Sequence, residues 1–290
     1  MTNSMLSFLL KSYPQPRSDT EIRNAVKQVV QEVTLAALGK TSFFEAAAFN
    51  GGTALRIFHE LPRFSEDLDF SVDEPAASGF ILNDYASTVD QYLLSVGIPA
   101  QFQIDRDEGI VRRAYVKGNG REILRAFGFD AAAANTAANE MIRVKIEADT
   151  TPLEAAETET KFLLKPYPSA VRVYTMPSMF AGKLHAVLCR QWAARIKGRD
   201  LYDYVFYIAN EVPVNLPHLQ SRLIQSGDWK PDAPLDLQTV KDLLNKRFSE
   251  IDYAMARKDV LPFIGDPASL DVWSEAFFTA ITEQLEGENR

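Results

Sequence analysis

The sequence predicts an α+β fold, in which a mixed sheet with flanking helices comes first and a helical region follows. Two observations predict this order. Several segments before Pro177 alternate apolar and polar residues with the period of a β-strand, whereas the segments after it repeat apolar residues with the period of an α-helix. We therefore place a boundary near residue 176, between an α/β domain over residues 1–175 and a helical domain over residues 176–290.

The first elements are predicted to be helices. A short apolar run near the N-terminus indicates a small helix, because no basic region precedes it as in a signal peptide. Ser18 and Glu21 have the spacing of a capping box, and the apolar stripe that follows predicts a helix ending at Gly39. Asn50-Gly51-Gly52 then predicts a turn, and a helix is expected from Thr53 to about Glu60.

Strands are predicted in the middle of the chain. In the stretch DLDFSV, Asp67 and Asp69 alternate with Leu68 and Phe70, which indicates a strand with one polar and one buried face. Further strands are expected at 99–107, 110–118, 121–129, 141–149 and 171–175. A helix is expected at 81–96, and the alanine-rich stretch 131–138 is interpreted as an exposed loop. Helical periodicity in the C-terminal half predicts helices at 178–196, 199–210, 216–226, 236–248 and 269–286.

Composition excludes some classes of protein. No segment approaches the length of apolar sequence that a membrane-spanning helix needs, so no membrane partner is expected. The single cysteine, Cys189, excludes an internal disulfide and favours the cytoplasm; we interpret it as a core residue. A net charge of −8 argues against a surface that binds nucleic acid throughout. It leaves room for local basic patches, such as the arginines and lysines at 106, 112, 113, 117, 121 and 125 and those at 190, 195, 197 and 199.

The two aspartates of the predicted strand are candidate ligands of a cation. Residues i and i+2 on a strand point the same way, so Asp67 and Asp69 would repel each other unless a positive charge lies between them. Mg²⁺ prefers carboxylate oxygens and keeps phosphate oxygens among its ligands. The alternative is that one aspartate caps a turn and the other is solvated, since a short D-x-D motif recurs by accident.

The glycines upstream favour the metal interpretation. Gly51 and Gly52 allow close approach of a ligand to the backbone, and the start of a helix at Thr53 offers N–H groups to phosphate. Glu147 lies on the polar face of a later strand and is our choice for a third metal-binding carboxylate. The alternative is an exposed residue paired with Lys145, which could itself contact a nucleotide.

Two motifs resemble a known family. The stretch GGTALRIFHELPRFSEDLDFSV at 51–72 is similar to the central motif of the AbiEii/AbiGii nucleotidyltransferase toxins, which include the MenT toxins and belong to the polymerase-β-type superfamily. The stretch AGKLHAVLCRQWAARIKGRDLYDYVFY at 181–207 resembles the family's lysine helix and its Arg-Asp-Leu-x-Asp turn. The chain has Gly-Thr where the superfamily often has Gly-Ser, and neither motif fixes the third carboxylate.

The resemblance implies roles for individual residues. Asp67 and Asp69 would bind Mg²⁺, and Gly51, Gly52, Thr53 and Ser65 would contact the phosphates of a nucleoside triphosphate. Lys183, from the helical domain, would neutralise triphosphate charge. Asp203 is the preferred catalytic aspartate and Asp200 the alternative, with helix capping as its other role. Apart from the resemblance, the simplest interpretation of Arg63 is an ion pair with Glu66.

The resemblance also implies partners. It predicts a toxin that transfers a nucleotide to an RNA acceptor such as the 3′ end of tRNA, and a cognate antitoxin protein. Three alternatives remain. They are a glycosyltransferase with a D-x-D metal site, transfer of the nucleotide to a protein hydroxyl, and a nucleotidyltransferase-like scaffold that only binds a partner.

Overall fold

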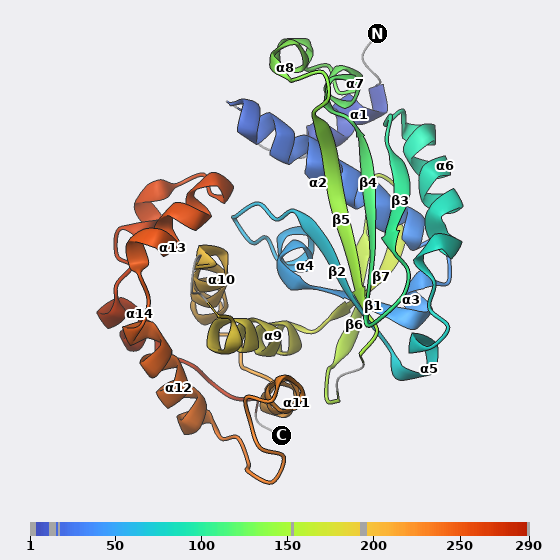
Figure 1. Cartoon of the computed structure of the whole chain (residues 1–290). Coiled ribbons are helices and arrows are strands. Elements are labelled where there is room, and N and C mark those ends of the chain that lie inside the picture. The colour runs from blue at the N-terminus through green and yellow to red at the C-terminus, as the bar shows by residue number, and fades with distance from the viewer. Residues whose placement is uncertain (1–3, 12–15, 17, 152–153, 192–195, 289–290) are drawn as a thin grey trace. The chain divides into compact units, whose positions relative to one another are not determined.

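The protein is seen in a computed structural model, which describes residues 4–11, 16, 18–151, 154–191 and 196–288 (Figure 1). The chain divides into two compact units. The first comprises Met1–Ala54, Ser65–Pro152 and Thr160–Val173, and the second comprises Leu55–Phe64, Leu153–Glu159 and Tyr174–Arg290. None of the helices in the described ranges combines the length and the hydropathy that crossing a membrane requires.

A mixed sheet forms the centre of the first unit. Its strands are β1 (Ala47–Asn50), β2 (Asp67–Val72), β3 (Gln101–Arg106), β4 (Val111–Asn119), β5 (Met141–Asp149), β6 (Thr158–Leu163) and β7 (Ser169–Tyr174), in the order β3-β4-β5-β2-β1-β7-β6. The β2 strand is antiparallel to β1 and parallel to β5. In this register Asp67 lies beside Lys145 and Asp69 beside Glu147, so the predicted polar positions of two strands are neighbours on one face.

Helices flank this sheet. They are α1 (Ser4–Leu10), α2 (Asp19–Leu38), α3 (Phe43–Ala46), α4 (Gly51–Phe58), α5 (Glu74–Ala77), the 3₁₀ turn η1 (Leu82–Tyr85), α6 (Ala86–Val96), α7 (Gly120–Ala126) and α8 (Asp130–Asn135). The α2 helix packs on β5, and α6 packs on both β3 and α2. Val33 of α2 and Leu68 and Ile146 of the strands are fully buried. The apolar face of the sheet is therefore the covered one, and the polar face carries the aspartates.

The second unit contains the helices after Tyr174. They are α9 (Met176–Cys189), α10 (Gly198–Ala209), α11 (Leu216–Ser226), α12 (Leu237–Ser249), α13 (Tyr253–Val260) and α14 (Glu275–Thr282), with 3₁₀ turns η2 (Leu261–Phe263) and η3 (Pro267–Leu270). Aromatic side chains fill its core: Phe180 stacks on Tyr207 with 4.4 Å between ring centroids. The hydroxyl of Tyr204 forms a 2.7 Å hydrogen bond with Thr282, which satisfies a buried polar atom.

Most of the predicted elements are confirmed, and the predicted α+β fold class is correct. Ser18 caps α2 by accepting a hydrogen bond from the N–H of Glu21 at 3.2 Å, as the capping box predicts. The helix expected from Thr53 begins two residues earlier, at Gly51. The helix expected over 178–196 ends at Cys189. Part of that expected helix, residues 192–195 with Arg195, lies outside the described residues.

Two predictions in the middle of the chain are wrong. Residues 121–129 do not continue the sheet, because Asn119 accepts hydrogen bonds from the N–H groups of Arg121 and Glu122 and starts helix α7. The alanine-rich stretch is helix α8 rather than an exposed loop, and Ala132 and Ala133 are buried. Alanine is the best helix former and is small enough to pack closely, which explains this difference.

Candidate active site

Three carboxylates lie on the polar face of the sheet, and we call them the acidic group: Asp67, Asp69 and Glu147. The two aspartates alternate with buried Leu68 and Phe70 along β2. This alternation fixes the direction of both carboxylates, because a shift of one residue would bury them and expose the apolar pair. Glu147 is the register partner of Asp69 on β5.

The glycine turn lies beside this acidic group. Gly51 has φ +77° and begins α4 directly after β1. A Cβ atom at this position would lie only 2.8 Å from Oδ2 of Asp69, so the carboxylate lies against the α-carbon of the glycine. The first N–H groups of a helix have no acceptor within the helix. The start of α4 and the carboxylate of Asp69 are thus neighbours.

Two cations neutralise part of the acidic group. Nζ of Lys145 lies 2.7 Å from Oε2 of Glu147 and 3.3 Å from Oδ2 of Asp67. Nε of Arg113, on β4, donates a hydrogen bond to the other oxygen of Glu147 at 2.8 Å. Burial alone would raise the pKa of Glu147, but the hydrogen bonds from Lys145 and Arg113 hold it below its ordinary value. Glu147 is therefore ionised at neutral pH and paired with Lys145, as the alternative interpretation expected.

The two residues predicted to offer hydroxyl ligands, Thr53 and Ser65, are both hydrogen-bonded to other elements of the chain. Thr53 is fully buried, and its Oγ1 donates a 2.5 Å hydrogen bond to the main-chain oxygen of Asp67. This bond ties the first turn of α4 to the start of β2. Ser65 is also buried, and its main-chain oxygen accepts a hydrogen bond from Nε2 of Gln31 on α2 at 3.0 Å. Contact of either hydroxyl with phosphate stays a prediction.

The acidic group has the chemistry of a site for a hard divalent cation. All three side chains offer carboxylate oxygens, which Mg²⁺ and Ca²⁺ prefer. The ammonium of Lys145 lies between Asp67 and Glu147, so a positive charge is already stabilised there. Among the described residues, the carboxylate oxygens of this group do not all lie within 4.8 Å of one another. An ion held by all three would therefore require these carboxylates to move closer together.

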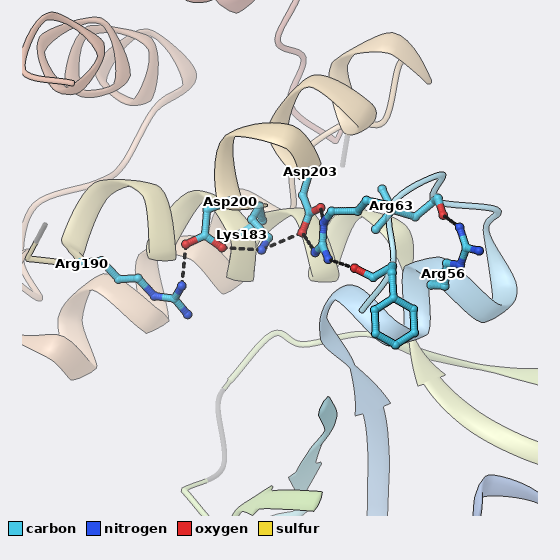
Figure 2. A network of polar contacts seen from close by, with 8 residues as sticks. Arg56, Arg63, Lys183, Arg190, Asp200 and Asp203 are labelled. Carbon is cyan, nitrogen blue, oxygen red and sulfur yellow. Dashed lines mark hydrogen bonds and ion pairs between the residues drawn. The ribbon is translucent and has the colours of Figure 1, made fainter. Parts of the chain in front are cut away.

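Arg63 joins the predicted basic and acidic residues of the helical region in an ion-pair network around the buried Asp203. We call it the buried ion-pair network and define it as Arg63, Lys183, Arg190, Asp200 and Asp203 (Figure 2). Nζ of Lys183 on α9 lies 2.7 Å from Oδ1 of Asp200 and 2.8 Å from Oδ2 of Asp203, both on α10. The guanidinium of Arg63 binds both oxygens of Asp203, at 2.6 and 2.7 Å. All five residues belong to the second unit.

Because the network is largely buried, its charged groups strongly affect one another's pKa values. Asp203 is fully buried, and Asp200 is almost as well covered. Burial would raise the pKa of Asp203, but the charges of Arg63 and Lys183 hold it below its ordinary value. Burial would likewise lower the pKa of Lys183, and the charges of Asp200 and Asp203 raise it. Lys183 is therefore a charged ammonium whose position is fixed by two carboxylates.

The network corrects two expectations. Arg63 pairs with Asp203 rather than with Glu66, which instead lies 3.3 Å from Lys27. In the described structure Asp200 does not cap its helix; its second oxygen binds Arg190 at 2.5 Å. The contact of Arg63 with Asp203 was not predicted from the sequence, although Arg63 opens the Arg-Phe-Ser-x-Asp-Leu-Asp-Phe stretch that carries the resemblance.

A mixed sheet with carboxylates on neighbouring strands and a helix beginning at a glycine beside them is the architecture of a nucleotidyltransferase. The chain belongs to the AbiEii family of nucleotidyltransferase toxins of type IV toxin–antitoxin systems, whose model it matches over residues 33–281. The protein is therefore a nucleotidyltransferase. Enzymes of this kind generally use a divalent metal ion.

Two solved structures that resemble this chain come from Helicobacter pylori. JHP933 is 19% identical with a TM-score of 0.47, and the similarity covers 89% of this chain and 89% of that one. A protein described as a candidate nucleotidyltransferase is 19% identical with a TM-score of 0.45, over 88% of this chain and 90% of its own. No curated protein matches the sequence.

Proposed function

We propose that the protein transfers a nucleotide from a nucleoside triphosphate to an RNA acceptor, such as the 3′ end of tRNA, with Mg²⁺ as cofactor. In this proposal it is the toxin of a toxin–antitoxin pair. One observation carries the proposal: the carboxylate of Asp69, on the polar face of β2, lies against Gly51 at the start of α4. Metal ligands and a phosphate-binding helix start are adjacent in this arrangement.

The residues of the first unit have distinct roles in this proposal. Gly51, Gly52 and Thr53 present backbone N–H groups to the triphosphate, and Ser65 lies two residues before the metal ligands. Asp67, Asp69 and Glu147 hold Mg²⁺, which when bound activates the acceptor oxygen and stabilises the leaving pyrophosphate. With the ion bound, the ammonium of Lys145 would pair with a phosphate oxygen in place of Asp67 and Glu147.

Lys183 has a supporting role in nucleotide binding. We propose that its ammonium neutralises triphosphate charge, while Asp200 and Asp203 hold it in position. The support is that both carboxylates contact Nζ of Lys183 within 2.8 Å and that Arg63 in turn fixes Asp203. Asp203 is assigned a positioning role because both of its oxygens are already bound and the side chain is fully buried.

We infer that the acceptor is RNA from a group of side chains on the polar face of the same sheet. We call this group the basic strip and define it as Tyr115, Lys117 and Arg143. The two cations are register partners on β4 and β5, and they lie 6.0 and 5.9 Å from the ring centroid of Tyr115. Tyr115 is in turn the register partner of Lys145. An aromatic ring beside two cations can stack on an unpaired base while the cations bind phosphates.

The remaining partners follow from the family. A cognate antitoxin protein neutralises the toxin, and the cytoplasm supplies the triphosphate and the RNA. The single cysteine is compatible with that reducing compartment.

The test is a transfer assay with each of the four labelled nucleoside triphosphates, Mg²⁺, and either total RNA or total protein as acceptor. The Asp69→Ala variant is expected to fold normally and to transfer nothing. The matched control is Asp73→Ala, which removes an exposed carboxylate directly after β2. Its pair with Arg172 lies at the surface, so little change in stability or transfer is expected.

Each outcome is informative. Label in tRNA that is lost in Asp69→Ala supports the proposal. Label in protein reassigns the acceptor and keeps the catalytic site. Transfer that Asp69→Ala leaves undiminished excludes the acidic group as the site, and no transfer together with intact partner binding indicates a non-catalytic scaffold.

A further inference from the structure

A second group of ligand-type side chains lies in the helical unit and shares no residue with the acidic group or the buried ion-pair network. It consists of His185 and Cys189 on α9 and Asp228 after α11, and we call it the mixed-ligand group. A ligand nitrogen, the thiol sulfur and a carboxylate oxygen lie within 4.8 Å of one another. Within the described residues, no other set of three or more histidine, cysteine, aspartate or glutamate side chains meets this condition.

Local structure brings these three side chains together. His185 and Cys189 are four residues apart on α9 and therefore point to the same side of the helix. Asp228 follows Gly227, which ends α11 with φ +80°. That left-handed residue reverses the chain, and the N–H of Asp228 donates a 2.9 Å hydrogen bond back to the main-chain oxygen of Leu223. The carboxylate is thus held by a helix end rather than by a free loop.

Polar contacts connect the members of the group to one another. The hydroxyl of Ser226 lies 3.0 Å from Nε2 of His185 and donates a hydrogen bond to Oδ2 of Asp228 at 2.6 Å. The thiol of Cys189 also hydrogen-bonds to Asp228. A partly buried carboxylate–thiol–imidazole arrangement of this kind has its ligand atoms assembled before any ion arrives.

A cavity gives access to the group. It has a volume of about 250 Å³ and is lined by Cys189, Asp228 and Glu250 and by the cations Lys246 and Arg247, among others. A metal ion needs an entry path and room for a water ligand. Both are available on this side, because two of the three ligand residues form part of the cavity wall.

We propose that the mixed-ligand group is a Zn²⁺ site. The ion is bound by the thiolate of Cys189, the imidazole of His185 and a carboxylate oxygen of Asp228, with a water molecule from the cavity in the fourth position. When the ion binds, the thiol of Cys189 releases its proton to solvent and its sulfur forms the bond to zinc. Zinc fits better than Mg²⁺, because thiolate and imidazole are soft or borderline ligands that hard cations avoid.

The bound ion has a structural consequence. It joins α9 to the connection between α11 and α12, residues 227–236, through three coordinate bonds. This connection has no regular secondary structure, so a metal ligand near its start would hold it against α9. The proposal is independent of the nucleotidyltransferase chemistry, since none of the three ligands belongs to the acidic group or to the buried ion-pair network.

The experiment measures metal binding directly. Protein freed of metal with a chelator is titrated with Co²⁺, which replaces Zn²⁺ and reports thiolate ligation through a charge-transfer band in the near ultraviolet. Zinc content is measured in parallel by elemental analysis after dialysis against Zn²⁺. One ion per chain, a thiolate–cobalt band and a higher melting temperature with Zn²⁺ are expected.

Matched variants separate a metal site from a hydrogen-bonded cluster. Cys189→Ala should lose the band, the bound zinc and the thermal shift, and Asp228→Asn should weaken zinc binding, whereas Asp232→Asn, an exposed residue of the same connection, should behave as the wild type. Ser226→Ala should keep the ion, because its hydroxyl is not a ligand. Substoichiometric zinc in the wild type, or a cobalt band that persists in Cys189→Ala, would overturn the proposal.

Discussion

At the scale of single residues, two lysines make the same kind of contact in different surroundings. Lys145 and Lys183 each lie between two carboxylates at hydrogen-bonding distance. The side chain of Lys145 is 28% exposed and that of Lys183 is 13% exposed, beside an aspartate that is fully buried. Water and ions can therefore compete for the partners of Lys145, whereas Lys183 is part of a closed network.

This difference predicts that Lys145 competes with the metal. In Lys145→Met, Asp67 and Glu147 lose their shared cation, so divalent ions should bind more tightly in the absence of nucleotide. The Michaelis constant for the triphosphate should rise, because the released ammonium no longer pairs with phosphate. Calorimetric titration with Mn²⁺ and steady-state kinetics measure the two effects. Lys258→Met, at an exposed site in the other unit, is the control, and unchanged Mn²⁺ affinity in Lys145→Met would contradict the prediction.

The buried network predicts a large effect on stability. Arg63→Met leaves the fully buried carboxylate of Asp203 with only Lys183 as a partner, so the free energy of unfolding should fall by about 3–5 kcal/mol. The matched control is Arg190→Met, which removes a half-exposed guanidinium and should cost less than about 1 kcal/mol. Urea denaturation measures both values.

A double variant tests whether the cost comes from the unpaired charge. Arg63→Met combined with Asp203→Leu replaces both partners with apolar groups, and it should recover part of the lost stability. If the double variant loses more free energy of unfolding than the two single variants lose together, the pair stabilises the fold for another reason.

At the scale of elements, the backbone at the start of α4 has a left-handed residue, Gly51, in close contact with Asp69 of the acidic group. Gly51→Ala introduces a side chain at φ +77°, where a Cβ would lie 2.8 Å from Oδ2 of Asp69. Gly109→Ala is a close control, because its φ is +78° and nothing lies within 4 Å of the added atom. Both variants should lose about 1–2 kcal/mol from backbone strain. Only Gly51→Ala should also lose nucleotide transfer, and equal transfer rates in the two variants would show that contact with Asp69 is unimportant.

Helices and strands could be predicted from the sequence where one local residue pattern dominates. The alternation around Asp67 and the capping box of α2 are complete within a few residues, so the sequence alone predicts them. The stretch after Asn119 contains apolar residues compatible with a strand or a helix, and the hydrogen bonds accepted by the Asn119 side chain select the helix. Glu147 could be chosen from its strand, but its pairing with Arg113 depends on the order of strands in the sheet.

At the scale of the whole molecule, long-range pairs were the least predictable part of the candidate site. Arg63 and Asp203 are 140 residues apart in the chain, and no sequence period connects them. The resemblance to the AbiEii family identified both segments but gave Arg63 no role, and its sequence neighbour Glu66 was the partner expected from proximity alone. The mixed-ligand group is similar: the spacing of His185 and Cys189 is visible on one helix, whereas Asp228 joins them only through the turn after α11.

For the proposed RNA acceptor, the charge distribution predicts how the affinity depends on salt. A net charge of −8 opposes binding over most of the surface, so the affinity should depend on few cations. In Lys117→Ala/Arg143→Ala, the basic strip loses both charges beside Tyr115. The slope of log affinity against log salt concentration should become shallower by about 1–2, because each phosphate contact to a single strand contributes roughly 0.7.

The control for this prediction removes the same charge elsewhere. Lys230→Ala/Lys258→Ala replaces two exposed lysines of the second unit and should leave the salt slope unchanged if the basic strip is the acceptor surface. Tyr115→Leu adds a test of stacking, since it should weaken binding without altering the slope. Fluorescence anisotropy with labelled tRNA at several salt concentrations measures all three variants. Equal slopes for the two double variants would show that RNA contacts neither pair preferentially, and the acceptor surface would have to be sought among the remaining cations.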